Sequence, residues 1–398
     1  MVWNLYNATY VDSYRIKDSF DIYIKNDKIL LEYNESDLQI NLHGRTILPS
    51  FINSFDNLLA TYLAYEGKNF PYYNWLMWDN ELKSSSLFEE RMLLDREDLY
   101  FLGSYKNIIS GVTFVIDPIP KFVFEDLIEE LDIDLLQDFG ISHSPVSYAL
   151  NWGKGIKEEF EYAKQKNLPF IIRVGEGFDT ESKNSIRILK ELNALDRNTV
   201  LIHGISLNKE DIELIKEYDC SFVWVPEVNE YIYGKTAPID LILEKEIRVC
   251  LGSGSSMYGS LNLLSTLKTA HKYISDSKVI FKMILDNPVE AFFLKKDKIL
   301  TNNSEASFII IDKISPENHD FIWDLDLNDI LLVVHKGVPI YGSSEFLSLF
   351  EYLEIPFEEL KIKKKHRLIK KGFTKKFNEI LFKIGKIVQF PFLPVEFD

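Results

Sequence analysis

Strand-length apolar runs alternate with segments of helical period through the middle of the chain. The strand-length runs cover 46–53, 111–117, 170–174, 200–204, 220–225 and 248–252, and the helical segments include 156–165, 183–192, 209–218 and 261–275. Such alternation is typical of a parallel α/β barrel. The segment 118–168 is short for the two strand–helix units that it should hold, which predicts a distortion around strands three and four.

On both sides of this region the pattern changes. Residues 20–24, 28–31 and 38–42 have the alternation of strands, and the Lys-Asn-Asp-Lys turn at 25–28 predicts a β-hairpin. Residues 306–312 and 330–337 also have strand character. Near the end of the chain, helical spacing links Ile369, Phe373, Phe377, Ile380, Leu381, Ile384 and Val388, with lysines on the other faces.

Composition narrows the class of protein. The 398 residues fit one barrel-sized domain plus a smaller one, and 46% apolar with 27% charged residues is ordinary for a globular protein. The longest apolar runs are too short for a transmembrane helix, and the N-terminus does not resemble a signal peptide. Both cysteines, Cys220 and Cys250, lie in apolar strand-like runs, where we expect reduced core residues of a cytoplasmic protein.

Charge is unevenly distributed. The net charge of −16 argues against nucleic acid as a partner, because phosphate attraction needs a basic face. Residues 361–386 nevertheless contain eleven Lys or Arg and one acid, a local charge of +10 that leaves −26 for the remainder. The favoured interpretation is that this basic helix docks on the acidic body of its own chain or on a second subunit of a homo-oligomer. An anionic membrane or an acidic partner is the alternative.

The segment 48–58, Leu-Pro-Ser-Phe-Ile-Asn-Ser-Phe-Asp-Asn-Leu, carries the most specific motif. It resembles the opening motif of the amidohydrolase superfamily, Pro-Gly-Phe-Ile-Asn-x-His-x-His, whose two histidines bind metal. The scaffold positions match at Pro49, Phe51, Ile52, Asn53 and Leu58. Phe55 and Asn57 stand where the family has its histidines.

The resemblance continues in order along most of the chain. Residues 111–117 resemble the family's second strand, and Tyr72-Tyr73-Asn74-Trp75-Leu76 resembles a loop phrase of its chlorohydrolase and aminohydrolase branch. The family implies a TIM-like (β/α)8 barrel beside a small β-sandwich built from both chain ends. We therefore expect a composite β-sandwich of 1–46 plus 298–345, a barrel of 47–297, and a basic helical C-terminal extension of 346–398.

Strands five and six carry the candidate catalytic residues. In Phe-Ile-Ile-Arg-Val-Gly-Glu-Gly, Arg173 stands at a family histidine position, and Glu176 matches the glutamate that commonly transfers protons. A guanidinium offers only donors and cannot bind a metal ion, although it can replace the ion's positive charge. Val-Leu-Ile-His-Gly resembles the family's sixth strand, so His203 is the one intact metal-ligand position. The alternative for His203 is a histidine held by hydrogen bonds at the barrel mouth.

Strands seven and eight complete the comparison. Val-Pro-Glu-Val-Asn resembles the family's seventh strand, with Asn229 matching and Glu227 adding charge, although a solvated loop glutamate is the alternative. On strand eight, Leu-Gly-Ser-Gly places Gly254 at the family's metal-binding aspartate position. The Gly/Ser run there lacks the pattern of a phosphate loop.

Of the five positions at which the family has metal ligands, this sequence keeps only one, whereas a divalent ion needs about three or four protein ligands. We therefore predict no metal and no cofactor, and a small-molecule ligand in a barrel mouth formed by Phe55, Asn57, Trp75, Glu227, Asn229 and Gly254. The first hypothesis is a pseudoenzyme or binding protein related to C–N hydrolases and deaminases. The second is a metal-independent hydrolase or deaminase of a small polar C–N substrate that uses Arg173, Glu176 and His203.

Overall fold

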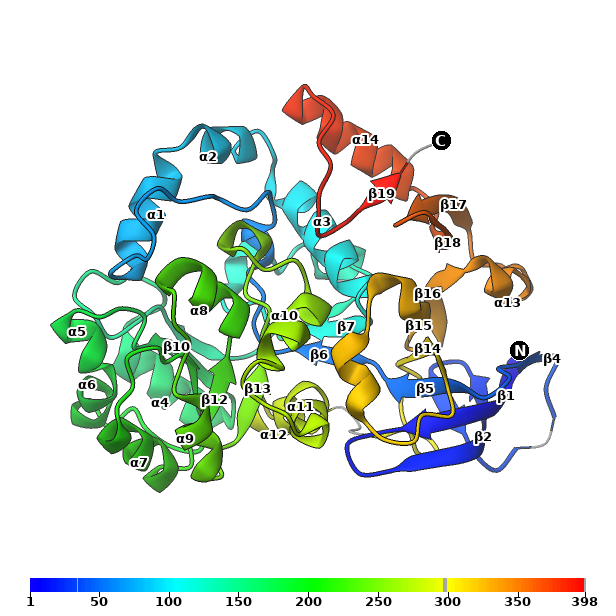
Figure 1. The fold of residues 1–398 in the computed structure, drawn as a ribbon, viewed down its shortest axis with the longest axis horizontal. Coiled ribbons are helices and arrows are strands. Elements are labelled where there is room, and N and C mark those ends of the chain that lie inside the picture. Colours follow the sequence, from blue (N-terminus) through cyan, green and yellow to red (C-terminus); the bar gives the residue numbers. More distant parts are fainter. Residues whose placement is uncertain (34, 296–298, 397–398) are drawn as a thin grey trace.

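A barrel of short parallel strands forms the centre of the chain in the computed structural model, which describes residues 1–33, 35–295 and 299–396 (Figure 1). Two ladders make up its wall: β6 (Phe51–Asn53), β7 (Val112–Val115) and β8 (Asp134–Leu135), then β9 (Gly140–Ser142), β10 (Phe170–Val174), β11 (Thr199–His203), β12 (Ser221–Trp224) and β13 (Val249–Leu251). The amide of Ser54 donates to the carbonyl of Leu251 at 3.1 Å, so β6 closes onto β13. The TIM-like barrel is confirmed, and the break between the ladders falls at strands three and four, where the sequence predicted distortion.

Helices follow the barrel strands and cover their outer faces (Figure 1). Local sequence sets several of their ends: Asn208 and Asp211 form a capping box at the start of α7, and α8 begins at Pro226 and ends before Gly234, whose φ is +65°. The helices are α3 (Arg96–Ile108), α4 (Ile156–Lys166), α5 (Thr180–Lys183), α6 (Ser185–Glu191), α7 (Lys209–Glu217), α8 (Pro226–Tyr233), α9 (Ile239–Glu244), α10 (Leu263–Ala270), α11 (Ser277–Ile284) and α12 (Asp286–Ala291).

A second sheet combines strands from the two ends of the chain. Its N-terminal members are β1 (Val2–Val11), β2 (Ile16–Lys25), β3 (Lys28–Leu30), β4 (Leu38–Asn41) and β5 (Arg45–Pro49). The later members are β14 (Phe308–Ile314), β15 (Ile330–His335), β16 (Val338–Ser343), β17 (Phe357–Ile362), β18 (Lys365–Lys370) and β19 (Val395–Glu396). The two groups join where β5 pairs with β14, with Ile47 opposite Ile310. This β-rich part is confirmed, while the domain boundaries expected from the sequence stay a prediction.

The segment after residue 345 contains strands as well as helices. After α13 (Leu347–Tyr352), β17 and β18 form a hairpin whose second strand pairs with β16, and α14 (Phe373–Ile384) begins after Gly372, whose φ is +103°. The predicted helical spacing therefore extends beyond one helix, because Ile369 belongs to β18, the positions from Phe373 to Ile384 belong to α14, and Val388 follows the end of α14.

Helix α14 docks on the acidic body of its own chain (Figure 1). Its Phe373, Phe377, Ile380 and Ile384 are buried, and the ring of Phe373 lies 4.7 Å from that of Tyr105 on α3. Lys376 and Lys383 both pair with Asp98, at 2.7 and 2.5 Å. The basic residues thus neutralise acids at the start of α3. No helix in the described part of the chain is long and apolar enough to cross a membrane.

Candidate ligand site at the barrel mouth

Arg173 is a buried cation that has no counterion among the residues that the structure describes. It is the fourth residue of β10, and its side chain is 8% exposed. Its guanidinium carbon lies 5.3 Å from the ring centre of Phe55 and 5.4 Å from that of Trp152, so it is placed between two aromatic faces. Within the described residues the guanidinium has neither a hydrogen bond nor an ion pair, and its Nε is fully buried.

His203 ends β11 in a left-handed conformation, with φ +78°. The Nδ2 of Asn229 donates to the carbonyl of His203 at 3.3 Å, which turns the Asn229 Oδ1 toward the histidine Nδ1 at 2.9 Å. The Nδ1 therefore donates, and Nε2 is left as the acceptor of the neutral ring. Burial lowers the pKa of His203, and nearby Arg173 lowers it further, whereas Glu176 acts in the opposite direction.

Glu176 lies across from His203 at the same rim. Its Oε1 is 3.5 Å from the His203 Nε2 and accepts a hydrogen bond from the hydroxyl of Tyr233 at 3.0 Å. Its Oε2 is buried and has no hydrogen-bond partner among the described residues, and the same holds for the His203 Nε2. The structure thus brings Arg173, Glu176 and His203 together, as the sequence predicted for a site, whereas their roles stay a prediction.

A cavity of about 90 Å³ lies beside these residues. Arg173 and Glu176 line it, together with Asn57, Trp75, Trp78, Asp79, His143, Leu150, Trp152, Ile232, Tyr233 and Tyr258. Its volume is below the roughly 300–1,000 Å³ of pockets that hold drug-sized ligands, and it has room for a few water-sized groups. The cavity is therefore suited to a compact polar molecule.

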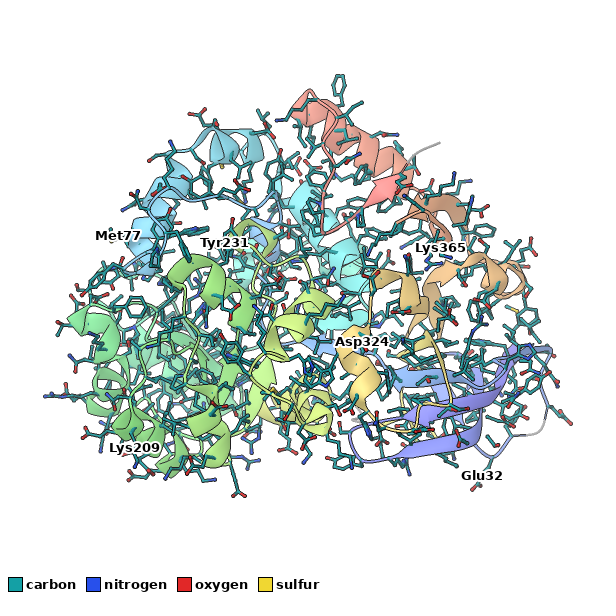
Figure 2. All side chains as sticks on the ribbon, viewed as in Figure 1. Glu32, Met77, Lys209, Tyr231, Asp324 and Lys365 are labelled. Atoms are coloured by element: carbon teal, nitrogen blue, oxygen red, sulfur yellow. The ribbon has the colours of Figure 1, made fainter. Side chains whose placement is uncertain are left out.

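The chain between β6 and α3 covers this cavity. It contains α1 (Trp75–Lys83) and α2 (Ser86–Arg91). The amide of Trp75 donates to the carbonyl of Glu176 at 3.3 Å, and the hydroxyl of Tyr231 on α8 donates to the carbonyl of Tyr65 at 2.8 Å. Met77 stands at the outer edge of α1, whereas Tyr231 lies further in (Figure 2). The aromatic phrase at 72–76 is thus part of a cover bonded to the barrel rim.

Four residues expected in the pocket lie outside the cavity wall. Phe55 and Asn229 are fully buried behind it, against Arg173 and His203 respectively. Glu227 ties α8 to α10, because its Oε2 accepts hydrogen bonds from the side chains of Ser260, Ser265 and Thr266. It is a structural carboxylate, and burial raises its pKa. Of the residues expected there, Asn57 and Trp75 do line the cavity.

Gly254 is the fourth expected residue that does not line the cavity, and its surroundings leave no room for a side chain. Its φ is +86°, and a Cβ built on it would lie 2.4 Å from Cγ2 of Val228 and 3.1 Å from Cγ1 of Val225. Any side chain at this position therefore needs both backbone strain and movement of the valines. Beside it, the Cβ of Phe55 stands 2.6 Å from where Gly252 would carry a Cβ, so Phe55 fills the space between β6 and β13.

His143 was missed from the sequence. It follows β9, the short strand inside the segment that the sequence marked as abbreviated. Its ring lies 4.5 Å from that of Trp75 and 4.8 Å from that of Trp152. Burial, with Arg173 next in importance, lowers the pKa of His143 to about 2, which keeps the ring neutral. A histidine directly after a strand of a barrel is the signal that points to this rim.

Further buried charged groups lie between α3 and the chain that follows β6 and β7. The ammonium of Lys106 on α3 lies 2.7 Å from Asp56, and the two side chains are 1% and 0% exposed. The Nδ2 of Asn107 also donates to Asp56, at 2.7 Å. Asp117 accepts a hydrogen bond from the hydroxyl of Tyr100 at 2.6 Å, and burial raises its pKa to about 8. These groups link β6 and β7 to α3.

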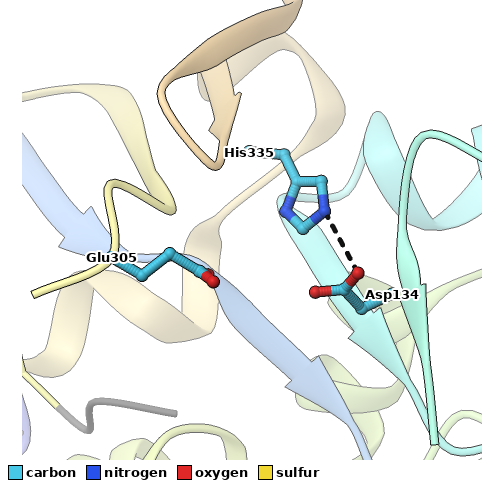
Figure 3. A group of neighbouring side chains, drawn as sticks. All are labelled: Asp134, Glu305 and His335. Carbon is cyan, nitrogen blue, oxygen red and sulfur yellow. Dashed lines mark ion pairs between the residues drawn. The ribbon is translucent and has the colours of Figure 1, made fainter. Parts of the chain in front are cut away.

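One cluster outside the mouth has the residue types of a metal site. Asp134, Glu305 and His335 place one ligand atom each within 4.8 Å of one another, the one such group among the residues that the structure describes (Figure 3). The His335 Nε2 lies 3.5 Å from Asp134, and the ammonium of Lys336 lies 2.6 Å from the same oxygen. Asp134 is therefore already paired with the ammonium of Lys336, and the cluster connects β8 to the β15–β16 hairpin.

Known proteins similar to this chain are deaminases and hydrolases. No family model matches the sequence. A 5-methylthioadenosine/S-adenosylhomocysteine deaminase of Thermoanaerobacter pseudethanolicus is 24% identical over 83% of this chain and 90% of its own length. The enzyme of the same description from Aquifex aeolicus is 25% identical over 80% and 87%.

Solved structures share the fold at lower identity. An adenosine deaminase from Xanthomonas campestris with bound zinc superimposes with a TM-score of 0.72, at 12% identity, over 96% of this chain and 97% of its own. Escherichia coli guanine deaminase has a TM-score of 0.65 at 14% identity, over 86% and 99%. The sequence relatives and the shared fold both agree with the resemblance of the sequence motifs to the amidohydrolase superfamily.

Proposed function

We propose that the barrel mouth of this chain binds a small polar molecule without a metal ion, and that metal-dependent hydrolysis is not its activity. The observation that carries this proposal is the placement of Phe55. Its ring lies 5.3 Å from the ring of His203 and 5.3 Å from the guanidinium carbon of Arg173. An apolar ring and a fixed cation thus occupy the space among the barrel strands where the resemblance would place a metal centre.

The donor set around this space does not suit a divalent ion. His203 and Glu176 are the nearest candidate ligands, one imidazole and one carboxylate, whereas zinc is held by three or four protein ligands. Arg173 adds repulsion toward any cation. A carboxylate at position 254 would have to displace Val228. We therefore propose that the chain retains the fold of its deaminase relatives without their deaminase activity.

Metal analysis and ammonia release test this proposal. We expect purified protein to contain far less than one zinc, iron or manganese ion per chain, and to release no ammonia from 5-methylthioadenosine or S-adenosylhomocysteine. His203→Ala and the pair Asp134→Ala/His335→Ala locate any metal that is found. A stoichiometric metal lost in His203→Ala would overturn the proposal, whereas one lost only with the Asp134 cluster would not involve the mouth.

Metal-independent C–N hydrolysis is the second candidate. It is favoured by the buried Glu176 Oε2 and His203 Nε2, both without hydrogen-bond partners among the described residues. In this candidate Glu176 takes a proton from water as the water oxygen bonds to the substrate carbon, and Arg173 stabilises the anion that forms. The C–N bond then breaks, and Glu176 returns the proton to the leaving nitrogen. Cyclic amides and aminated heterocycles should then be turned over in the presence of a chelator. Loss of that turnover in Arg173→Ala, Glu176→Gln and His203→Ala would support it, and unchanged rates would exclude it.

A further inference from the structure

The cavity contains a recognition group for an anion. A buried charge is costly unless it is paired and hydrogen-bonded. The Arg173 guanidinium is almost fully buried, touches two aromatic faces, and lacks a paired acid among the described residues. Its planar set of donors matches a carboxylate, which it can bind through two parallel hydrogen bonds.

A second donor lines the same cavity. The indole Nε1 of Trp75 is buried without a hydrogen-bond partner among the described residues, and an indole N–H can only donate. Trp75 and Arg173 are connected through aromatic contacts, because the rings of Trp75 and Trp152 both pack on His143. Two unused donors on neighbouring groups favour a ligand end that only accepts hydrogen bonds.

The same cavity also presents unused acceptors. The Glu176 Oε2 and the Asn57 Oδ1 are buried and unpartnered within the described part of the chain. Asp79 lines the cavity too, but its carboxylate pairs with Lys83 at 2.6 Å. The aromatic rings of Trp78 and Tyr258, which meet edge to face at 4.7 Å, supply a surface that also attracts cations. These groups favour a ligand end that carries N–H donors and positive charge.

We infer that the cavity binds a small aminocarboxylate, with its carboxylate on Arg173 and its amino group toward Glu176. This inference rests on the proposed metal-free site, because a metal ion among the same residues would take the place of the amino group. The cavity volume of about 90 Å³ restricts the ligand to a compact molecule with few heavy atoms. The ligand pairs with both the cation and the acceptors that have no partner among the described residues.

Calorimetric titration of the full chain tests the inference with matched probes. Glycine, β-alanine and 4-aminobutyrate are compact and differ in length. Each is compared with its amide, which lacks the negative charge, and with its deaminated acid. We expect at least one aminocarboxylate to bind saturably and at least about tenfold more tightly than either analogue, a difference of about 1.4 kcal/mol. Wild-type protein that binds the amide as tightly as the acid, or that binds none of the three acids, overturns the inference.

Variants assign the binding to Arg173. Arg173→Gln should weaken the acid about tenfold or more and leave the amide unchanged, and Glu176→Gln should remove the preference for the amino group. Arg187→Gln is the matched control, because it removes the same charge from a side chain that is 73% exposed and paired with Glu191. Equal affinity in Arg173→Gln and Arg187→Gln contradicts the inference.

Metal content measured on the same samples separates the two proposals. Metal-free protein that fails to prefer aminocarboxylates refutes the ligand class alone. Stoichiometric metal at His203 refutes the proposed function itself.

Discussion

Gly254→Ala measures how closed the space at the end of β13 is. The new Cβ would have to adopt a φ of +86° and would lie 2.4 Å from Cγ2 of Val228. A left-handed conformation costs an L-residue about 1–2 kcal/mol, and overpacking typically costs about 1–3 kcal/mol more. We therefore expect the free energy of unfolding to fall by about 2–5 kcal/mol.

Gly385→Ala is the matched control for backbone strain. Gly385 has φ +75°, and no described atom lies within 4 Å of the Cβ that alanine would add. In this variant the free energy of unfolding should fall only by the cost of the left-handed backbone conformation, about 1–2 kcal/mol. The difference between the two variants then measures the steric contact with the valines.

Urea unfolding, followed by circular dichroism and tryptophan fluorescence, provides the assay, with coincident transitions as the check on two-state behaviour. In a double-mutant cycle, Val228→Ala should recover part of the loss in Gly254→Ala, with a coupling of about 0.5–3 kcal/mol. If Gly254→Ala were no worse than Gly385→Ala, the valines would move aside easily. A carboxylate at position 254 would then fit beside the valines.

Two further predictions concern the buried charged groups between α3 and the ends of β6 and β7. Lys106→Met leaves Asp56 buried and unpaired, so we expect a loss of about 3–5 kcal/mol at neutral pH in urea unfolding. Because an unpaired Asp56 folds protonated, this loss should grow as the pH rises above about 4, and a smaller loss at pH 8 than at pH 4 would contradict it. Asp117 has a pKa raised to about 8, so folding takes up a proton between about pH 4 and 8, and Asp117 lowers stability as the pH rises. Asp117→Asn should flatten that slope, and an unchanged slope would exclude Asp117 as its source.

The barrel was predictable from sequence because its strands are continuous apolar runs with helices between them. The predicted helix at 156–165 matches α4 to within one residue, since amphipathic spacing and the left-handed Asn167 that ends the helix are local signals. The predicted segment 183–192 contains all of α6 and begins at the last residue of α5. Local pattern failed for β18, because its pairing with β16 and β17 is a tertiary contact that overrides helical spacing.

The site was only partly predictable. Arg173 and His203 lie at the C-terminal ends of barrel strands and Glu176 follows one, so the fold alone places them at one rim. His143, Trp152 and Tyr258 come from short or irregular segments, and no periodic pattern indicates which way such side chains point. Glu227 was predicted to line the pocket and does not. Side chains of α10 bind its carboxylate by hydrogen bonds instead.

The joining of β5 to β14 has a consequence for synthesis of the chain. Ile47 leaves the ribosome roughly 260 residues before its partner Ile310, a delay of about 13–50 s at about 5–20 residues per second. During that time the edge of β5 that will pair with β14 is open, and Ile47 and Leu48, both fully buried in the finished protein, lack their cover. Until the last third of translation, the nascent chain therefore exposes an unpaired, apolar strand edge to chaperones or to neighbouring copies of the chain.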